Sequence, residues 1–171
     1  MNLKLFLIRV FSVIALLSTT NMLQAMAPQE STSSDIERIE NKLFRTLHQD
    51  NDDEACRIIA EYHDKFTLYT LELALVISIR HKCNSFTRML FDRYGDKIDT
   101  AYLTLATWEA VQSENNCILS LLVDTPALFN RFPSWLLKSV FNVAYKKGNT
   151  TAQEIIRKAQ LRQKSYSCAM Q

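Results

Sequence analysis

Apolar residues recur at helical spacing along most of the chain, and short polar segments interrupt them at regular intervals. Ile36, Ile39, Leu43 and Leu47 show this spacing, which is typical of a helix that buries one face. The pattern predicts four helix pairs. Their first helices begin at Ser34, Thr67, Thr100 and near Trp135. A single helical turn is expected at 126–130, where Pro126 fits a first turn.

The polar turns and the helices around them form a weak internal repeat. Four segments align, namely Leu47–Ala60, Ser78–Phe91, Ala110–Val123 and Ala144–Arg157, and their starts are 31, 32 and 34 residues apart. A period of this size is the signature of a solenoid, in which each unit buries its apolar face against its neighbours. The repeat therefore predicts a stacked array of helical hairpins.

Local residue chemistry predicts where several helices begin and end. Ser34 and Glu37 can form a capping box at the first helix, and Thr100 can cap the fifth. Gly95 is expected to adopt a left-handed C-cap, and Gly148 to end the first helix of the last pair. The apolar period fails from about Gln163, so a frayed tail is expected over 163–171.

Composition supports an all-α fold. The 171 residues include only 2 Gly and 3 Pro, and no long stretch alternates apolar with polar residues. A chain of many strands would need more turn residues and such an alternation. The fold class predicted is all-α, a solenoid of about four stacked helical hairpins over residues 34–162.

The N-terminus has the pattern of a signal peptide. Lys4 and Arg9 form a basic region, an apolar stretch follows, and Ala25 ends a small-residue cleavage site. We expect cleavage after Ala25, with 26–33 as a polar linker. A transmembrane anchor is the alternative, and the apolar run is short for one. The expected localisation is secreted or periplasmic, with no membrane contact after cleavage.

Charge argues against a nucleic-acid partner. The whole chain has 20 basic and 18 acidic residues, and residues 1–25 contain two of the basic ones, so the remainder is formally neutral. A nucleic-acid-binding domain normally carries a basic stripe.

The four cysteines have no metal-ligand spacing. Cys56 is expected to be a small buried residue. The sequence leaves undecided whether Cys83 and Cys117 form a disulfide.

No catalytic motif stands out. The histidines His48, His63 and His81 have no Cys, Ser or carboxylate at ligand or triad spacing, so we expect them to be solvated or to cap helices. The acidic segment 50–54 lacks the glycine and the final glutamate of an EF-hand loop. We expect no enzyme activity, no cofactor and no metal.

The two tryptophans differ in their expected environment. Trp135 is expected in the core, while Trp108 could be buried or exposed.

The segments AVQSENNCILSLLV from Ala110 and AYKKGNTTAQEII from Ala144 resemble ankyrin repeats, with Gly148 at the turn glycine of the family. The resemblance covers about residues 45–157. Asn51, Lys82 and Glu114 take the place of that glycine in the other copies, and the Thr-Pro-Leu-His motif that opens the family's first helix is missing.

The resemblance implies a non-catalytic protein-interaction module, expected to be monomeric. In the family, partner contacts come from the end of each first helix. By register these positions are Arg80, His81, Gln112, Ser113, Lys146 and Lys147. An exported protein of this kind is a host-directed effector or a periplasmic adaptor. An exported all-α enzyme or small-ligand-binding protein without a recognisable motif is the alternative function.

Overall fold

The chain divides into two units, residues 1–33 and 34–171. The computed structural model describes the backbone of residues 31–169 and the side chains of 34–163. The predicted signal peptide lies outside the described residues. Within 31–169 every regular element is a helix, which confirms the all-α prediction.

The helix boundaries follow the predicted pairs closely. The helices are α2 (Ser31–His48), α3 (Asp52–Tyr62), α4 (Leu68–Arg80), α5 (Asn84–Tyr94), α6 (Thr100–Gln112), α7 (Asn116–Asp124), α8 (Pro126–Phe129), α9 (Leu136–Lys146) and α10 (Thr150–Ala169). The one-turn helix expected at 126–130 is confirmed as α8, with Pro126 in its first turn.

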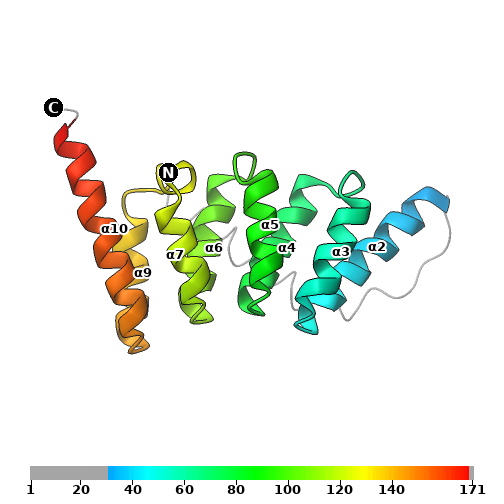
Figure 1. The fold of residues 1–171 in the computed structure, drawn as a ribbon, viewed down its shortest axis with the longest axis horizontal. Coiled ribbons are helices and arrows are strands. Elements are labelled where there is room, and N and C mark those ends of the chain that lie inside the picture. The colour runs from blue at the N-terminus through cyan, green and yellow to red at the C-terminus, as the bar shows by residue number, and fades with distance from the viewer. Residues whose placement is uncertain (1–30, 170–171) are drawn as a thin grey trace, which may run out of the picture. The chain divides into compact units, whose positions relative to one another are not determined.

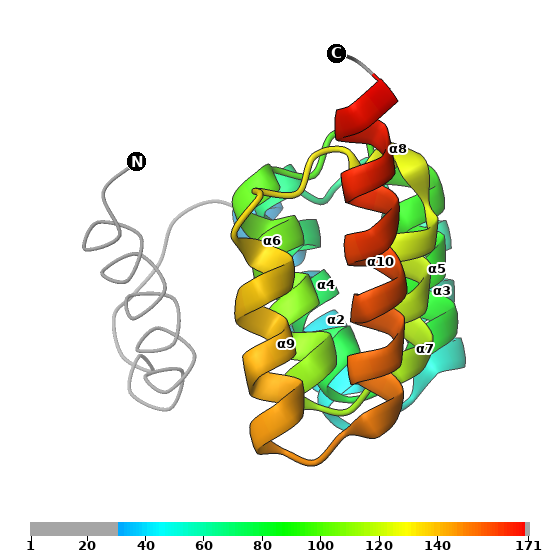
Figure 2. The same cartoon turned by 90° about the vertical axis from the view of Figure 1, so that its left-hand side faces the viewer.

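The helices form two layers. In one layer α4 packs on α6 and α6 packs on α9, while in the other α3, α5, α7 and α10 pack in that order. Figures 1 and 2 show both layers, with α2 behind α3 and next to α4. Each layer is therefore built from corresponding helices of successive hairpins. We call them the α4–α6–α9 layer and the α5–α7–α10 layer.

The core lies between these layers. Helix α4 is buried along most of its length, from Thr70 to Ile79 apart from the half-buried Leu73. Large side chains with almost no exposure fill the space around it. They include Leu47, Ile59, Leu75, Ile79, Phe86, Leu103, Ile118 and Leu119. The apolar period along the chain thus marks the faces on which the two layers meet.

One tight turn joins the two helices of each of the four hairpins. All four turns lie at one edge, the lower one in Figure 1. Each contains one residue with a left-handed backbone, at φ values of 55°, 58°, 56° and 69°. These residues are Asp50, Lys82, Glu114 and Gly148. Three of the four are not glycine, although this conformation favours glycine.

The backbone hydrogen bonds of these turns are also the same. The residue after the left-handed one donates its N–H to a carbonyl five residues earlier in the chain. The four bonds are Asn51 to Thr46 at 3.2 Å, Cys83 to Ser78 at 2.9 Å, Asn115 to Ala110 at 2.8 Å and Asn149 to Ala144 at 3.0 Å. This is the Schellman pattern, which satisfies carbonyls that a helix end otherwise leaves without a donor.

The turn geometry corrects the register of the first copy by one residue. Asp50, not Asn51, has the left-handed backbone, and Asn51 is instead the N-cap of α3. The true intervals between the four left-handed residues are therefore 32, 32 and 34. The earlier alignment matched residue types, whereas the equivalent positions are defined by backbone conformation.

Several helix ends differ from the prediction. Helix α2 begins at Ser31, so Ser34 lies inside it and not at its cap, and α10 continues through the predicted tail to Ala169. Neither 31–34 nor 163–169 contains a glycine or proline that would interrupt a helix. Thr67 is the N-cap of α4, but Asp99 caps α6 in place of the predicted Thr100.

Gly95 is not a left-handed cap. Its φ is −56°, an ordinary helical value. A Cβ added there would lie 2.4 Å from the Phe91 carbonyl oxygen and 3.3 Å from Leu128. Glycine at this position is therefore explained by close packing and not by backbone conformation, whereas Gly148 has open space around its Cα and a φ of 69°.

Candidate functional site

The six residues predicted to contact a partner lie at the ends of α4, α6 and α9 or directly after them. Because these three helices pack side by side, the residues share the edge that carries the four tight turns. We call this edge, with the C-terminal ends of α2, α4, α6 and α9, the turn edge. The repeat register therefore placed the predicted residues together, although their individual environments differ.

Arg80 bridges two hairpins. Its Nε donates to Glu109 Oε1 at 3.0 Å and its Nη2 to Glu109 Oε2 at 3.1 Å, so the guanidinium of α4 binds the carboxylate of α6 in bidentate fashion. This pairing raises the pKa of Arg80. A bidentate pair has a fixed geometry, so Arg80 is held in place by its neighbour.

His81 takes part in a cluster that links the first two hairpins. Its Nδ1 lies 2.8 Å from Asp50 Oδ1, and its Nε2 lies 3.1 Å from His48 Nδ1. The two imidazole rings are nearly perpendicular, with centroids 4.9 Å apart. As expected, His48 is exposed and His81 caps the end of α4, but the contact between the two rings was not predicted.

The remaining predicted residues divide into engaged and exposed ones. Ser113 donates to the carbonyl of Ile79 at 3.3 Å and to that of Glu109 at 2.7 Å. Lys147 lies 3.5 Å from Glu114. Gln112 and Lys146 are exposed. Four of the six residues thus have contacts within the chain. A partner that binds there must leave these contacts in place or replace them with its own.

Three exposed aromatic side chains belong to the α4–α6–α9 layer. Tyr69 is 52 % exposed, Trp135 37 % and Tyr145 69 %. Tyr69 and Trp135 stand the same number of residues before the left-handed residue of their hairpins, so they are equivalent positions of α4 and α9. The prediction that Trp135 belongs to the core is wrong, because the neighbouring Leu136 and Leu137 fill it instead.

Two further aromatic residues of α6 join this surface. Tyr102 is half-buried and meets Tyr69 edge-on, with ring centroids 6.5 Å apart. Trp108 is also half-buried. The five residues Tyr69, Tyr102, Trp108, Trp135 and Tyr145 are here called the aromatic set. Repeat register relates only Tyr69 and Trp135, which belong to the first and third hairpins of this layer; Tyr102, Trp108 and Tyr145 occupy other positions of the repeat.

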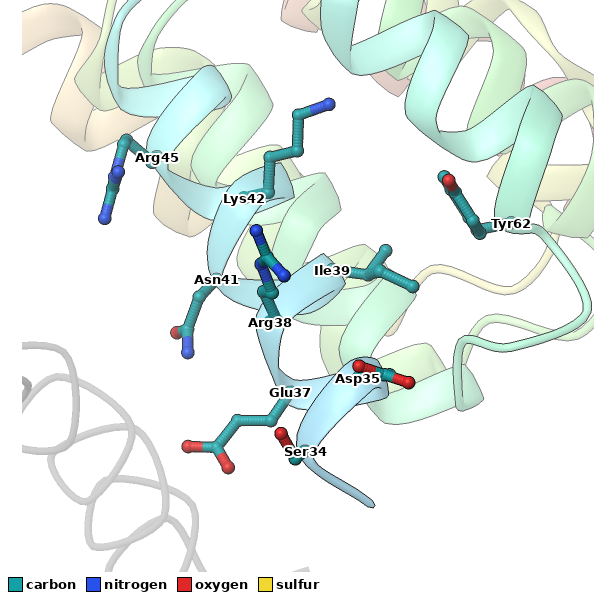
Figure 3. A pocket seen from close by; sticks show the side chains of 9 residues that line it. All are labelled: Ser34, Asp35, Glu37, Arg38, Ile39, Asn41, Lys42, Arg45 and Tyr62. Atoms are coloured by element: carbon teal, nitrogen blue, oxygen red, sulfur yellow. The ribbon is translucent and has the colours of Figure 1, made fainter. Parts of the chain in front are cut away.

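A hollow of about 890 Å³ lies at the N-terminal end of the described unit. Its lining comes almost entirely from α2, and Tyr62 of α3 stands opposite (Figure 3). Ile39 points toward the side of Tyr62, whereas Glu37 and Asn41 point away from it. The hollow is wide and polar, and its lining has no nucleophile paired with a base.

The cysteines of the described residues are free. Cys83 is buried and Cys117 is exposed, so the disulfide between them does not form, and Cys56 is half-buried. Cys83 is the residue after a left-handed position and Cys117 lies two residues further along in the next hairpin, so the two thiols are not at equivalent places. Burial raises the pKa of the Cys83 thiol to about 11.

Within residues 34–163 no three or more His, Cys, Asp or Glu side chains are arranged to hold a metal ion. None of the described helices is long and apolar enough to cross a membrane. Comparison of the chain with protein-family models, with curated proteins and with solved structures finds no match.

Proposed function

We propose that the chain is a non-catalytic protein-interaction module, in which ankyrin-like helical hairpins stack into a short solenoid. The order of helix packing in each layer supports this proposal, because each helix meets its counterpart in the next hairpin. The four equivalent turns support it as well. We further propose that residues 1–25 direct export, so that the partner is met in a periplasmic or extracellular space.

The observation that carries the proposal is the aromatic set on the α4–α6–α9 layer. Tyr145 lies at the turn edge, whereas Tyr69, Tyr102 and Trp135 lie at the opposite, N-terminal ends of α4, α6 and α9. Trp, Tyr and Arg are the residues most enriched among energetic hot spots of interfaces. Tyr145 lies next to Lys146, and both are exposed at the end of α9. Large aromatic side chains left in solvent carry an unfavourable free energy that a partner surface removes.

The proposed contact set therefore shifts from the six predicted residues toward the aromatic side chains. Gln112 and Lys146 remain in it as exposed polar neighbours. Arg80, His81, Ser113 and Lys147 are proposed to shape the turn edge through their bonds to adjacent hairpins.

Affinity capture with the full chain tests the proposal. The variant Tyr69→Ser, Trp135→Ser, Tyr145→Ser removes the three most exposed aromatic residues of the set. Leu161→Ser is the matched control, because Leu161 is 65 % exposed but belongs to α10 in the other layer. We expect wild type and control to retain a partner that the triple variant loses, with circular dichroism confirming that all three fold.

Equal capture of the same partner by the triple variant would remove the aromatic set from the interface. In that case the variant with Arg80, His81, Lys146 and Lys147 changed to Ala decides whether the turn edge is used instead. Retention by both variants contradicts the proposed surface as a whole.

A further inference from the structure

The side chains of His48, His81 and Asp50 form a cluster of titratable groups at the turn edge. Its members come from two hairpins, since His48 ends α2, Asp50 lies in the following turn and His81 follows α4. Sequence spacing did not suggest the cluster. The stacking of hairpins about 32 residues apart brings His48 and His81 together.

The hydrogen bonds of the cluster define how its protons are arranged. Asp50 Oδ1, 2.8 Å from His81 Nδ1, accepts the proton on that nitrogen. When His81 is neutral, its Nε2 then carries a lone pair, directed toward His48 Nδ1. A carboxylate that fixes the tautomer of a histidine in this way is the usual partner of a metal-binding imidazole.

The distance between the two imidazole nitrogens fits a shared metal ion. Zinc lies about 2.0–2.1 Å from a histidine nitrogen, so two such ligands at right angles or at the tetrahedral angle are about 2.9–3.4 Å apart. His48 Nδ1 and His81 Nε2 are 3.1 Å apart. A zinc ion at this distance from both nitrogens lies to one side of the line that joins them, so the rings must turn away from their hydrogen-bonded arrangement; His48 is exposed, which leaves its ring room to turn.

We propose that His48 and His81 together bind one zinc ion, with Asp50 holding the His81 ring and water completing the coordination. The site has two protein ligands and is therefore distinct from a closed structural zinc site with four. The metal takes the place of the proton on His48 Nδ1, and the neutral His48 ring then carries its proton on Nε2 instead. Because the ligands belong to α2 and to the end of α4, the ion connects the first hairpin to the second.

The surrounding charges permit a cation. The Asp50 carboxylate lies 2.8 Å from His81 and supplies a negative charge beside the two imidazoles. Arg80 is the nearby fixed cation, and the bidentate carboxylate of Glu109 neutralises it.

Zinc titration of the full chain at pH 7.5, followed by isothermal calorimetry and by thermal unfolding, tests the site. Cys117→Ser and Cys168→Ser form the background for all variants, since thiolates also bind zinc. We expect saturable binding of one zinc ion per chain and a melting temperature that rises with zinc concentration.

His48→Ala and His81→Ala should each abolish the zinc-dependent rise in melting temperature. His63→Ala is the matched control and should leave it unchanged, because the exposed His63 ends the other helix of the first hairpin. Asp50→Asn should weaken zinc binding about 10-fold or more, as expected for a residue that orients a ligand. Absence of saturable binding to the parent, or equal binding by either ligand variant, overturns the proposal.

Discussion

Asp52 caps a helix of the next hairpin through the backbone of Ser85. Its Oδ2 accepts the Ser85 N–H at 2.8 Å and its Oδ1 accepts the Phe86 N–H at 2.7 Å. Helix α5 needs this partner because its own N-cap, Cys83, makes no side-chain capping bond. In the turns on either side, Asn51 and Asn115 cap their own helices. One hairpin thus supplies the cap that another lacks.

Replacing Asp52 with Ala should destabilise the protein by about 1–2 kcal/mol. The change leaves two N–H groups at the start of α5 without an acceptor, which is the loss measured when an N-cap is removed. Urea unfolding followed by circular dichroism measures the effect. Asp53→Ala is the control, since Asp53 is the exposed neighbour in the first turn of α3. Equal losses for the two variants would show that the capping bonds contribute nothing beyond helix-end charge.

Cys83→Asn should restore a local cap and make Asp52 less important. Asn115, at the equivalent position, accepts from the Ile118 N–H and donates to the Ile79 carbonyl at 3.2 Å. The Cys83 thiol already lies 3.9 Å from the corresponding carbonyl of Leu47. We expect a gain of about 0.5–1 kcal/mol in the free energy of unfolding. In the double variant the loss caused by Asp52→Ala should shrink; an unchanged loss contradicts a shared capping role.

The two turns with Lys82 and Gly148 allow a test of backbone strain. Lys82 has a φ of 58°, which costs a residue with a Cβ about 1 kcal/mol. Lys82→Gly should therefore raise the free energy of unfolding by up to about 1 kcal/mol, and Gly148→Ala should lower it by a similar amount. Chemical denaturation measures both. Changes of the same sign in the two variants would contradict the assignment of strain to these positions.

The helices and their order were predictable from the sequence, because each helix has apolar residues at helical spacing within its own segment. The register of the first turn was not predicted correctly, because residue types alone suggested that Asn51 is equivalent to Gly148. Backbone conformation places Asp50 there. Contacts between hairpins were missed for a related reason. Arg80 with Glu109 and His48 with His81 are 29 and 33 residues apart, and such pairs become visible only when the hairpins are stacked in the correct register.

The environments of single residues were the least predictable part. Trp135 was placed in the core because leucines follow it, yet it is the residue before α9 begins and its side chain is exposed. Gly95 was assigned to a left-handed turn because glycine often ends a helix, whereas here the close approach of the Phe91 carbonyl oxygen, and less closely of Leu128, leaves no room for a Cβ. Both depend on which neighbouring element covers the position, and that information lies elsewhere in the chain.

The buried Cys83 thiol should resist modification while Cys117 reacts. At pH 7 the Cys83 thiol is almost fully protonated, because its pKa is about 11, and it is inaccessible. Maleimide labelling of a Cys168→Ser variant, analysed by peptide mass spectrometry, should modify Cys117 first and Cys83 only after urea is added. Rapid native labelling of Cys83 would contradict its burial.

The same thiol gives a pH dependence with a defined sign. The pKa of Cys83 is higher in the folded chain than its ordinary value of 9.0, so the folded state holds the proton more tightly. Its contribution to stability is present below pH 9 and is lost as the pH rises toward 11. A Cys83→Ala variant should lack this part of the decline, which urea unfolding at pH 8 and pH 10.5 can resolve.

Glu72 should be replaceable by glutamine without loss of stability at pH 7. Its side chain is buried, and its Oε1 accepts the Asp99 N–H at 2.7 Å, a bond that the amide oxygen of glutamine can also accept. Burial raises the pKa of Glu72. The hydrogen bond from the Asp99 N–H lowers it and the charge of the Asp99 carboxylate raises it, so the net shift is upward. The carboxyl group therefore stabilises the fold below its ordinary pKa, and this contribution is lost as the pH rises through the raised value. We expect Glu72→Gln to be at least as stable as wild type at pH 7 and to lose that advantage near pH 4.

Glu37→Gln is the control, because Glu37 is an exposed residue of α2 and the change removes the same charge. It should show no such crossover in urea unfolding. A marked loss of stability for Glu72→Gln at pH 7 would show that the ionised carboxylate itself is required at the start of α6.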